Sequence, residues 1–240
     1  MKSLNSKLLE NKNNKMSQIQ EEIKRINNGL PQGVRLVAIS KFHPAEAIEE
    51  AYEAGQRIFG ESHVQELQQK VELLPKDIEW HFIGHLQTNK VKYIAPYIKL
   101  IHSVDSIKLL QEIDKQAKKV GRIIPILIQL HIAEEETKFG FTIEECRSLL
   151  TTQDWSEYPN VQISGLMCMA TNTDNMEQVR REFRTVHEFF VEMKASCTNL
   201  TSFTELSMGM SHDYPIALEE GSTLIRVGSK IFGERDYSKG

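Results

Sequence analysis

Short apolar segments alternate with longer amphipathic segments along most of the chain. The apolar segments are rich in Val, Ile and Leu, a composition typical of parallel strands that are covered on both faces. Strands are predicted at eight places, over residues 34–40, 58–60, 80–84, 99–104, 123–132, 161–170, 203–208 and 223–227. The amphipathic segments predict helices over residues 44–55, 64–74, from about 87, 106–120, 140–150, 175–195 and 214–220.

Eight strands that alternate with helices predict a parallel sheet, and eight such units close most naturally into a (β/α)8 barrel. On the pattern alone, an open doubly wound sheet with helices on both faces remains an alternative. No internal repeat, low-complexity segment or Pro/Gly-rich linker marks a domain boundary. We therefore expect one barrel domain over residues 31–240.

The first thirty residues are polar but carry apolar residues near helical spacing. These apolar residues are Leu4, Leu8, Leu9, Met16, Ile19, Ile23 and Ile26. The spacing predicts an amphipathic leading helix within residues 1–30 that ends at Asn27-Asn28-Gly29. Because an apolar helix face needs a covering surface, we expect this helix to pack against the barrel.

The composition excludes several classes of protein. The 240 residues include 29 Lys and Arg against 33 Asp and Glu, and this net charge of −4 makes nucleic acid an unfavourable main partner. No apolar run approaches the roughly 20 residues that span a bilayer, and the polar N-terminal segment lacks the apolar core of a signal peptide. Cys146, Cys168 and Cys197 are odd in number and widely spaced, which argues against a disulfide framework and a zinc site. We therefore expect a cytoplasmic protein without a metal.

In a (β/α)8 barrel the active site lies where strands end and helices begin, and Lys41 directly follows the first predicted strand. Apolar surroundings favour the neutral, nucleophilic form of an amine. A lysine that only marks the exit of the strand into solvent fits the same position. The position alone leaves both interpretations open.

Two segments near the C-terminus combine glycine with hydroxyl side chains, at residues 207–211 (SMGMS) and 226–229 (RVGS). They follow the seventh and eighth predicted strands, where barrels commonly bind phosphate through backbone N–H groups and hydroxyls. The presence of both segments favours a role in binding a phosphorylated ligand over the interpretation that they are ordinary turns. Arg226 lies inside the last predicted strand and needs a buried acceptor, which is either a ligand or the carboxylate of a structural ion pair.

Other residues that suggest chemistry have simpler interpretations. His81 and His85 are four residues apart, but on a strand that leads into Gly84 they do not share a face that could bind a metal. We expect His81 inside the barrel and His85 in a loop near the pocket. Cys168 lies in a methionine-rich segment, and packing explains it better than a role as a nucleophile. No motif for nucleotide binding or serine hydrolysis occurs.

Six segments together resemble the pyridoxal 5'-phosphate homeostasis protein family, also known as proline synthase co-transcribed proteins. The segments follow the order of the family's motifs and cover nearly the whole chain after the leading helix. They are LVAISKFHP, GESHVQE, WHFIGHLQTNK, GLMCMA, LSMGMSHDYPIALEEGST and IRVGSKIFGERDY. The third segment and the last two are highly specific for the family.

The resemblance implies a barrel of the kind found in fold-type III enzymes such as alanine racemase, without their C-terminal β-domain. It also implies that the chain holds pyridoxal 5'-phosphate (PLP) as a Schiff base, and the lysine that matches is Lys41. Arg226 would face the pyridine nitrogen, which weakens the ring as an electron sink. The phosphate would be held by Ser207, Met208, Ser211, Gly228 and Ser229.

The chain departs from the family pattern at three of these motifs. The family usually has Asn where this chain has Ser62, and we expect Ser62 to bind the cofactor through its hydroxyl over a shorter reach. The family more often has Thr at the position of Ser229, and serine keeps the hydroxyl donor. His212 stands where an acidic or small residue is commoner.

The favoured hypothesis is a PLP-binding protein that buffers or delivers the cofactor, without robust catalytic turnover and with apo forms of PLP-dependent enzymes as candidate recipients. An amino-acid racemase is the alternative, but racemases of this type use a further domain, and we expect none because only eleven residues follow Ser229. A Schiff-base aldolase for a phosphorylated sugar fits Lys41 and the phosphate loops but leaves Arg226 unexplained. A monomer and a weak homodimer are both compatible with the sequence.

Overall fold

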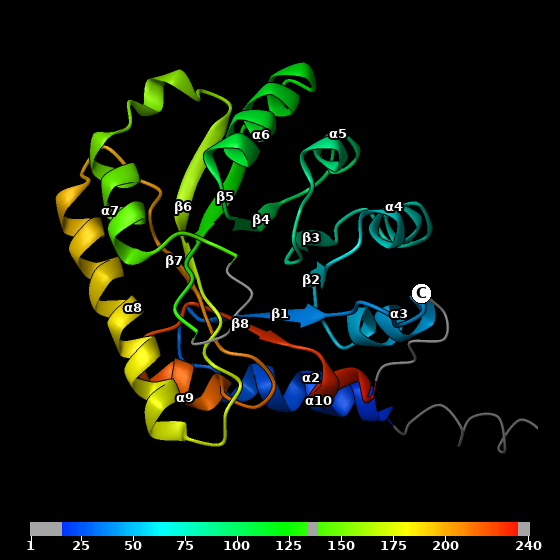
Figure 1. The fold of residues 1–240 in the computed structure, drawn as a ribbon. Coiled ribbons are helices and arrows are strands. Elements are labelled where there is room, and N and C mark those ends of the chain that lie inside the picture. The colour runs from blue at the N-terminus through cyan, green and yellow to red at the C-terminus, as the bar shows by residue number, and fades with distance from the viewer. Residues whose placement is uncertain (1–15, 134–138, 235–240) are drawn as a thin grey trace, which may run out of the picture.

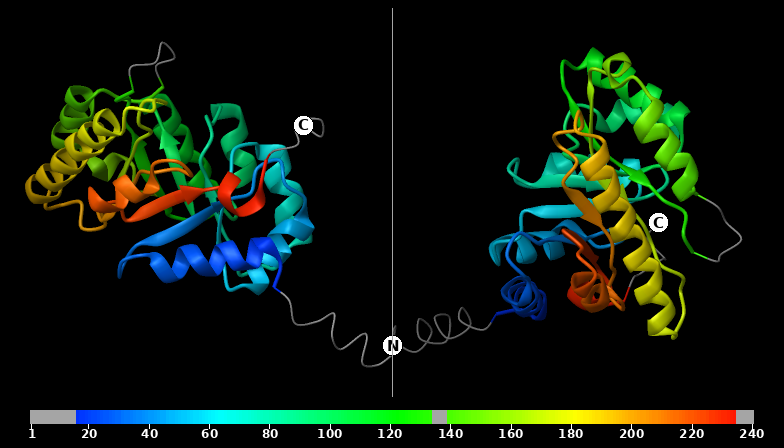
Figure 2. Two further views of the ribbon diagram at one scale, coloured as in Figure 1. Left: turned by 90° about the horizontal axis from the view of Figure 1, so that it is seen from below. Right: turned by 90° about the vertical axis from the view of Figure 1, so that its left-hand side faces the viewer.

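Eight parallel strands form a closed barrel in which each strand pairs with its neighbours in chain order (Figure 1, Figure 2). The computed structural model describes residues 16–133 and 139–234. The strands are β1 (Arg35–Ile39), β2 (Ile58–Glu61), β3 (Glu79–Phe82), β4 (Leu100–Val104), β5 (Ile124–Gln129), β6 (Val161–Met167), β7 (Glu205–Ser207) and β8 (Leu224–Val227). The first and last strands close the barrel, with Val37 opposite Arg226. This topology confirms the predicted (β/α)8 barrel over the open sheet.

Helices surround the barrel on its outer face (Figure 1). Six of them lie where the pattern predicts them: α3 (Ala45–Glu53), α4 (Val64–Leu73), α6 (Ile107–Lys119), α7 (Ile143–Thr152), α8 (Met176–Ser196) and α9 (Tyr214–Glu219). The helix expected from about residue 87 is only a 3-10 turn, η1 (Thr88–Lys90), followed by α5 (Val91–Ile94), and Pro96 limits its extension. The pattern does not predict the short helices η2 (Trp155–Glu157) and α10 (Ser229–Phe232).

The chain before the barrel forms α2 (Gln18–Gly29), which contacts α3, α10 and β1. Ser17 begins the helix with a capping box, in which its hydroxyl accepts from the Gln20 N–H and the Gln20 side chain accepts from the Ser17 N–H. Ile23 and Ile26 are buried against the barrel layer. Leu4, Leu8 and Leu9, which the spacing places in the same helix, lie outside the described residues.

Apolar residues fill two regions, one between the strands and the helices and one inside the barrel. Successive side chains of a strand point to opposite faces, so Val37 and Ile39 point inward while Leu36 and Ala38 face the helices. Much of the remaining interior is polar. Its buried polar side chains include His81, His102, Ser207 and Arg226. In the part of the chain that the structure describes, no helix is both long enough and apolar enough to cross a membrane.

Candidate functional site

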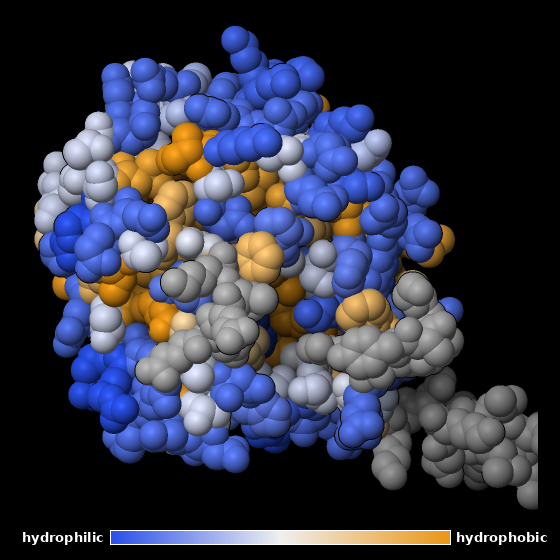
Figure 3. Space-filling model, in the orientation of Figure 1, coloured by the Kyte–Doolittle hydropathy of each residue, from blue (hydrophilic) through white to orange (hydrophobic). Residues whose placement is uncertain are grey.

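A pocket of about 510 Å³ lies where the first and last strands of the barrel end. Its lining brings together residues that are far apart in the sequence, namely Lys41, Ser211, Arg226, Gly228 and Ser229. Met169 and Met210 line the same pocket and are partly exposed. Figure 3 shows that apolar side chains are exposed among hydrophilic ones on this side of the molecule. His212 and Glu234 also line the pocket, so it combines one amine, one guanidinium, one imidazole, one carboxylate, hydroxyl groups and apolar surface.

Lys41 reaches the pocket because the backbone turns sharply at the end of β1. The Ser40 N–H donates to the Gly60 carbonyl and continues the sheet, and the His43 N–H donates back to the Ser40 carbonyl. Between them, Phe42 has a φ of 65°, in the left-handed region. The side chain of Lys41 is half-buried in the pocket wall. It does not simply mark an exit into solvent.

A buried ionic cluster, formed by Glu61, Glu66 and Lys70, lies directly behind Lys41. Lys70 Nζ donates to Glu61 Oε1 and Glu66 Oε1 at 2.7 Å each and to the Ser40 carbonyl at 2.8 Å. Glu66 also accepts from the Phe42 N–H at 2.6 Å, so the cluster holds the backbone on both sides of Lys41. Burial raises the pKa of Glu61 to about 7, although Lys70 lowers it.

Sequence reasoning missed this cluster, although a signal for part of it exists. Glu66 and Lys70 are four residues apart on a predicted helix, a spacing at which opposite charges pair. The burial of Lys70, and the addition of Glu61 from β2, depend on how α4 packs on the barrel.

Arg226 is a buried cation with neutral partners. Its guanidinium donates to Ser207 Oγ at 2.6 Å and to the Cys168 carbonyl at 2.9 Å. No carboxylate of the described residues lies within ion-pair distance of it, so the structural ion pair that the sequence left open is not formed with that part of the chain. Burial lowers the pKa of Arg226, since the charged form loses hydration.

The two glycine-containing loops after β7 and β8 meet at the pocket. Ser211 Oγ accepts from the Gly228 N–H at 3.3 Å, which ties one loop to the other. Gly209 allows the first loop to turn, because its φ is +92° and a Cβ there would lie 2.5 Å from Ala217 Cβ. Ser229 lines the pocket as the first residue of α10.

Three of the predicted cofactor-binding residues do not line this pocket. Ser207 is fully buried beneath it and hydrogen-bonds Arg226, while the side chain of Met208 is buried in the apolar layer between barrel and helices. Ser62 lies at the exit of β2, and its hydroxyl is 3.2 Å from His63 Nδ1. The contacts of all three with a cofactor stay predictions.

The structure also places the other polar residues that the sequence singles out. His81 is buried in the barrel interior, and the exposed His85 pairs with Asp105 through its Nδ1 at 2.9 Å. The described residues contain no group of three metal-binding side chains. Burial raises the pKa of Cys168 to about 12, so it is a protonated thiol at neutral pH and a poor nucleophile.

Comparisons with known proteins agree on one family. Residues 15–236 match the alanine racemase N-terminal domain family. The pyridoxal phosphate homeostasis protein of Aquifex aeolicus is 41% identical over 223 residues, which cover 92% of this chain and 96% of that protein. The protein of the same name from Escherichia coli strain K12 is 37% identical over 213 residues, or 87% of this chain and 89% of that protein.

Solved structures are similar to this chain at two levels of sequence identity. PipY of Synechococcus elongatus is 39% identical, with TM-scores of 0.84 without PLP and 0.80 with PLP bound, and the match covers 90% of this chain and all of PipY. Alanine racemase from Bartonella henselae is 14% identical, with a TM-score of 0.67 over 90% of this chain and 60% of that enzyme. At that identity the likeness shows the barrel fold alone.

Proposed function

The chain belongs to the pyridoxal phosphate homeostasis protein family, and from this premise we propose that it binds PLP at the mouth of the barrel and contributes to the cellular balance of this cofactor. The observation that carries the proposal is the pocket that collects Lys41, Arg226, Ser211, Gly228 and Ser229. These groups match the three chemically distinct parts of PLP, which are its aldehyde, its pyridine nitrogen and its phosphate.

Each group fits one part of the cofactor. Lys41 Nζ is the amine that would condense with the aldehyde. The Gly228 backbone and the hydroxyls of Ser211 and Ser229 would hold the phosphate, since backbone N–H groups and hydroxyls are its usual donors at the mouth of a barrel. Arg226, a cation without a carboxylate partner among the described residues, would donate to the pyridine nitrogen.

The same geometry favours storage of PLP over robust catalysis. When bound, PLP supplies an electron sink, and this is strongest when the ring nitrogen is protonated. A guanidinium has no acceptor and no readily lost proton, so Arg226 would keep the nitrogen unprotonated and the sink weak. We therefore propose a cytoplasmic carrier that buffers PLP or delivers it to apo-enzymes. The described cysteines, which are free and buried, support a reducing compartment.

The first experiment tests whether Lys41 holds the cofactor. Purified protein loaded with PLP should absorb in the visible range and give a borohydride-trapped adduct, and Lys41→Ala should lose both signals. Lys115→Ala is the matched control because Lys115 is an exposed lysine on α6. A wild-type protein without visible absorption or trapped adduct would refute PLP binding through Lys41.

A second experiment separates the carrier from an enzyme. PLP transfer from the loaded protein to an apo-enzyme should be measured beside transfer from free PLP at equal concentration. Interconversion of amino-acid enantiomers is measured in parallel. Racemisation with a kcat on the order of 1 per second or more would replace the carrier by a racemase.

A further inference from the structure

A line of buried hydrogen bonds runs from Arg226 through the interior of the barrel. Arg226 donates to Ser207 Oγ, which lies 2.9 Å from His102 Nδ1. His102 Nε2 in turn lies 2.9 Å from His81 Nδ1. All four side chains are buried, so each hydrogen must be placed where it satisfies a partner.

Arg226 fixes the direction of this line. A guanidinium only donates, so Ser207 accepts from it and is left with one hydroxyl hydrogen to give. His102 Nδ1 is the acceptor within reach of that hydrogen among the described residues. Burial lowers the pKa of His102 well below its usual value, and the neutral ring that accepts at Nδ1 carries its proton on Nε2.

The same reasoning makes His81, the last residue of the line, a hydrogen-bond donor at its Nε2 atom. His102 Nε2 donates to His81 Nδ1, and burial lowers the pKa of His81 to about 3, so this ring is neutral too. Its proton consequently lies on Nε2, which has no hydrogen-bond partner among the described residues. His81 is only 2% exposed, yet it lines a second pocket.

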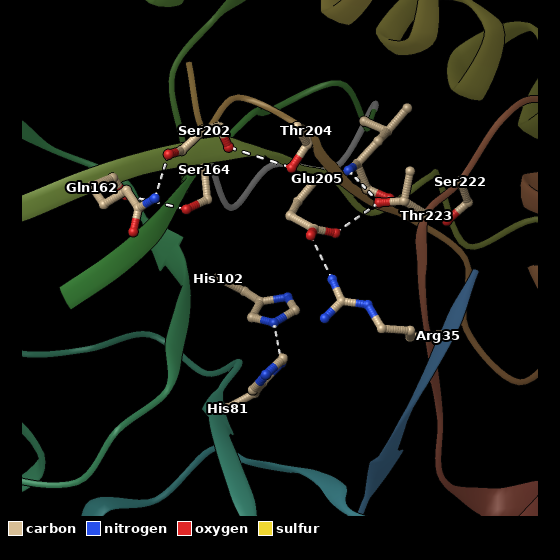
Figure 4. A network of polar contacts seen from close by, with 11 residues as sticks. Arg35, His81, His102, Gln162, Ser164, Ser202, Thr204, Glu205, Ser222 and Thr223 are labelled. Atoms are coloured by element: carbon tan, nitrogen blue, oxygen red, sulfur yellow. Dashed lines mark hydrogen bonds and ion pairs between the residues drawn. The ribbon is translucent and has the colours of Figure 1, made fainter. Parts of the chain in front are cut away.

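The second pocket lies at the opposite end of the barrel, where the strands begin. It has a volume of about 300 Å³, and its wall is mostly polar. Figure 4 shows Arg35, His81, His102, Gln162, Ser164 and Glu205 turned towards a common space. Arg35 pairs with Glu205, while Lys99 and Glu79 contribute one charge of each sign. The formal charge of the wall is thus balanced.

We propose that this second pocket is a binding site for a small monocarboxylate, whose oxygen accepts the N–H of His81 Nε2. Arg35 and Lys99 place positive charge near that imidazole and favour an anion beside it. Glu79 and Glu205 disfavour a dianion such as inorganic phosphate. A metal ion or an ammonium group would need a lone pair on His81 Nε2. The reverse direction of the line, which would supply that lone pair, leaves the hydroxyl hydrogen of Ser207 without an acceptor among the described residues, so we expect neither at His81.

The experiment is an NMR titration of protein labelled with ¹⁵N-histidine, in which acetate, glycine, inorganic phosphate and methylammonium are added separately at constant ionic strength. The starting spectra should show both His81 and His102 protonated on Nε2. Acetate and glycine should give a saturable shift at His81 Nε2, phosphate a weaker one and methylammonium none. Equal responses to acetate and glycine identify the carboxylate as the group that binds.

Variants separate this site from the PLP pocket. His81→Phe should weaken acetate binding at least about tenfold, since a hydrogen bond to a charged acceptor is lost, and His85→Phe, an exposed histidine outside the line, should not. If His81→Phe does not fold, Lys99→Ala replaces it, because Lys99 is exposed, and it should also bind acetate more weakly. Lys41→Ala should bind acetate as the wild type does, even if the proposed PLP function fails.

Two results would overturn the proposal. One is His81 protonated on Nδ1, or binding Zn²⁺ through Nε2, since both contradict the direction of the line. The other is the absence of a saturable shift at His81 at acetate concentrations of tens of millimolar, which would leave the polar interior with a structural role only.

Discussion

Lys70 and Arg226 are two buried cations of this barrel, each 5% exposed, with opposite surroundings. Lys70 has two carboxylate partners, Glu61 and Glu66, and satisfies its third hydrogen at the Ser40 carbonyl. Arg226 has a serine hydroxyl and a backbone carbonyl, and no carboxylate among the described residues. One charge is neutralised by the protein, and the other faces a pocket.

Under the proposed function, the difference separates a structural charge from a charge that would serve a ligand. A buried ion without a counter-ion is costly, and its cost is recovered when a bound molecule supplies an acceptor. Lys70 already has counter-ions in Glu61 and Glu66. Together with Glu66 it holds the backbone on either side of Lys41. Arg226 lacks it, and we therefore expect its substitution to affect binding more than folding.

The largest expected effect tests this contrast directly. Lys70→Met should lower the free energy of unfolding by about 3–5 kcal/mol, because it leaves Glu61 buried without its cation. Arg226→Met in the PLP-free protein should lower it by less, about 1–2 kcal/mol, since the cost of leaving the Cys168 carbonyl without its donor is partly offset by the loss of a buried, unpaired charge. Urea unfolding of both variants measures the two values. Similar losses would show that Arg226 is structural as well.

The second expected effect is a loss of stability in acid. His81 and His102 have folded-state pKa values below the unfolded value of 6.5, so below pH 6.5 the unfolded chain binds more protons and stability falls. Glu61 opposes this, because its folded-state pKa of about 7 lies above the unfolded value of 4.5 and stability from this group rises as the pH falls from 7 to 4.5. Two histidines against one carboxyl leave a net loss of roughly 3 kcal/mol between pH 6.5 and 4.5.

Urea unfolding at several pH values measures this slope. Glu61→Gln removes the opposing contribution, so the slope between pH 6.5 and 4.5 should become about twice as steep. A slope that is flat in Glu61→Gln, where the opposing carboxyl is gone, would show that the histidines are protonated in the fold, which would also contradict their assigned tautomers.

The smallest expected effect concerns the binding of PLP and leaves folding unchanged. Ser229→Ala should weaken PLP retention by about 1–3 kcal/mol, because a phosphate loses one charge-assisted hydrogen bond. Its unfolding without PLP should match that of the wild type. Equilibrium dialysis measures retention, and Ser148→Ala on the exposed face of α7 is the control. Unchanged retention would remove Ser229 from the phosphate site.

Much of the fold follows from local sequence. The eight strands are recognisable because each is short, apolar and bounded by turn residues, and the helices have a clear apolar face. The prediction was less good near residue 87, where α5 has only four residues before Pro96, and at the one-turn helix α10. Single turns carry too few residues for a periodic pattern.

The candidate site likewise contains residues that local sequence predicts and residues that it does not. Lys41, Ser211, Arg226, Gly228 and Ser229 were predictable because strand ends and the last two loops form one end of a barrel. The buried networks were not, since each depends on the pairing of distant strands.

The distance along the sequence between hydrogen-bonded residues explains why the buried networks could not be predicted. Ser207 and His102, which share a hydrogen bond, are 105 residues apart, and Arg226 and the Cys168 carbonyl are 58 apart. The contact of Ser207 with a phosphate stays a prediction. As the last residue of β7, Ser207 lies beneath the pocket, where it hydrogen-bonds Arg226 and His102.

The left-handed backbone of Phe42 offers a way to change the conformation of the turn next to Lys41. This conformation costs a residue other than glycine roughly 1–2 kcal/mol, and the ring of Phe42 lies against His63, with centroids 5.0 Å apart. Phe42→Gly would relax the backbone and remove that ring contact, leaving the neighbouring amine chemically intact. Residue 42 is therefore the position at which the backbone beside Lys41 can be loosened while the lysine itself is left unchanged.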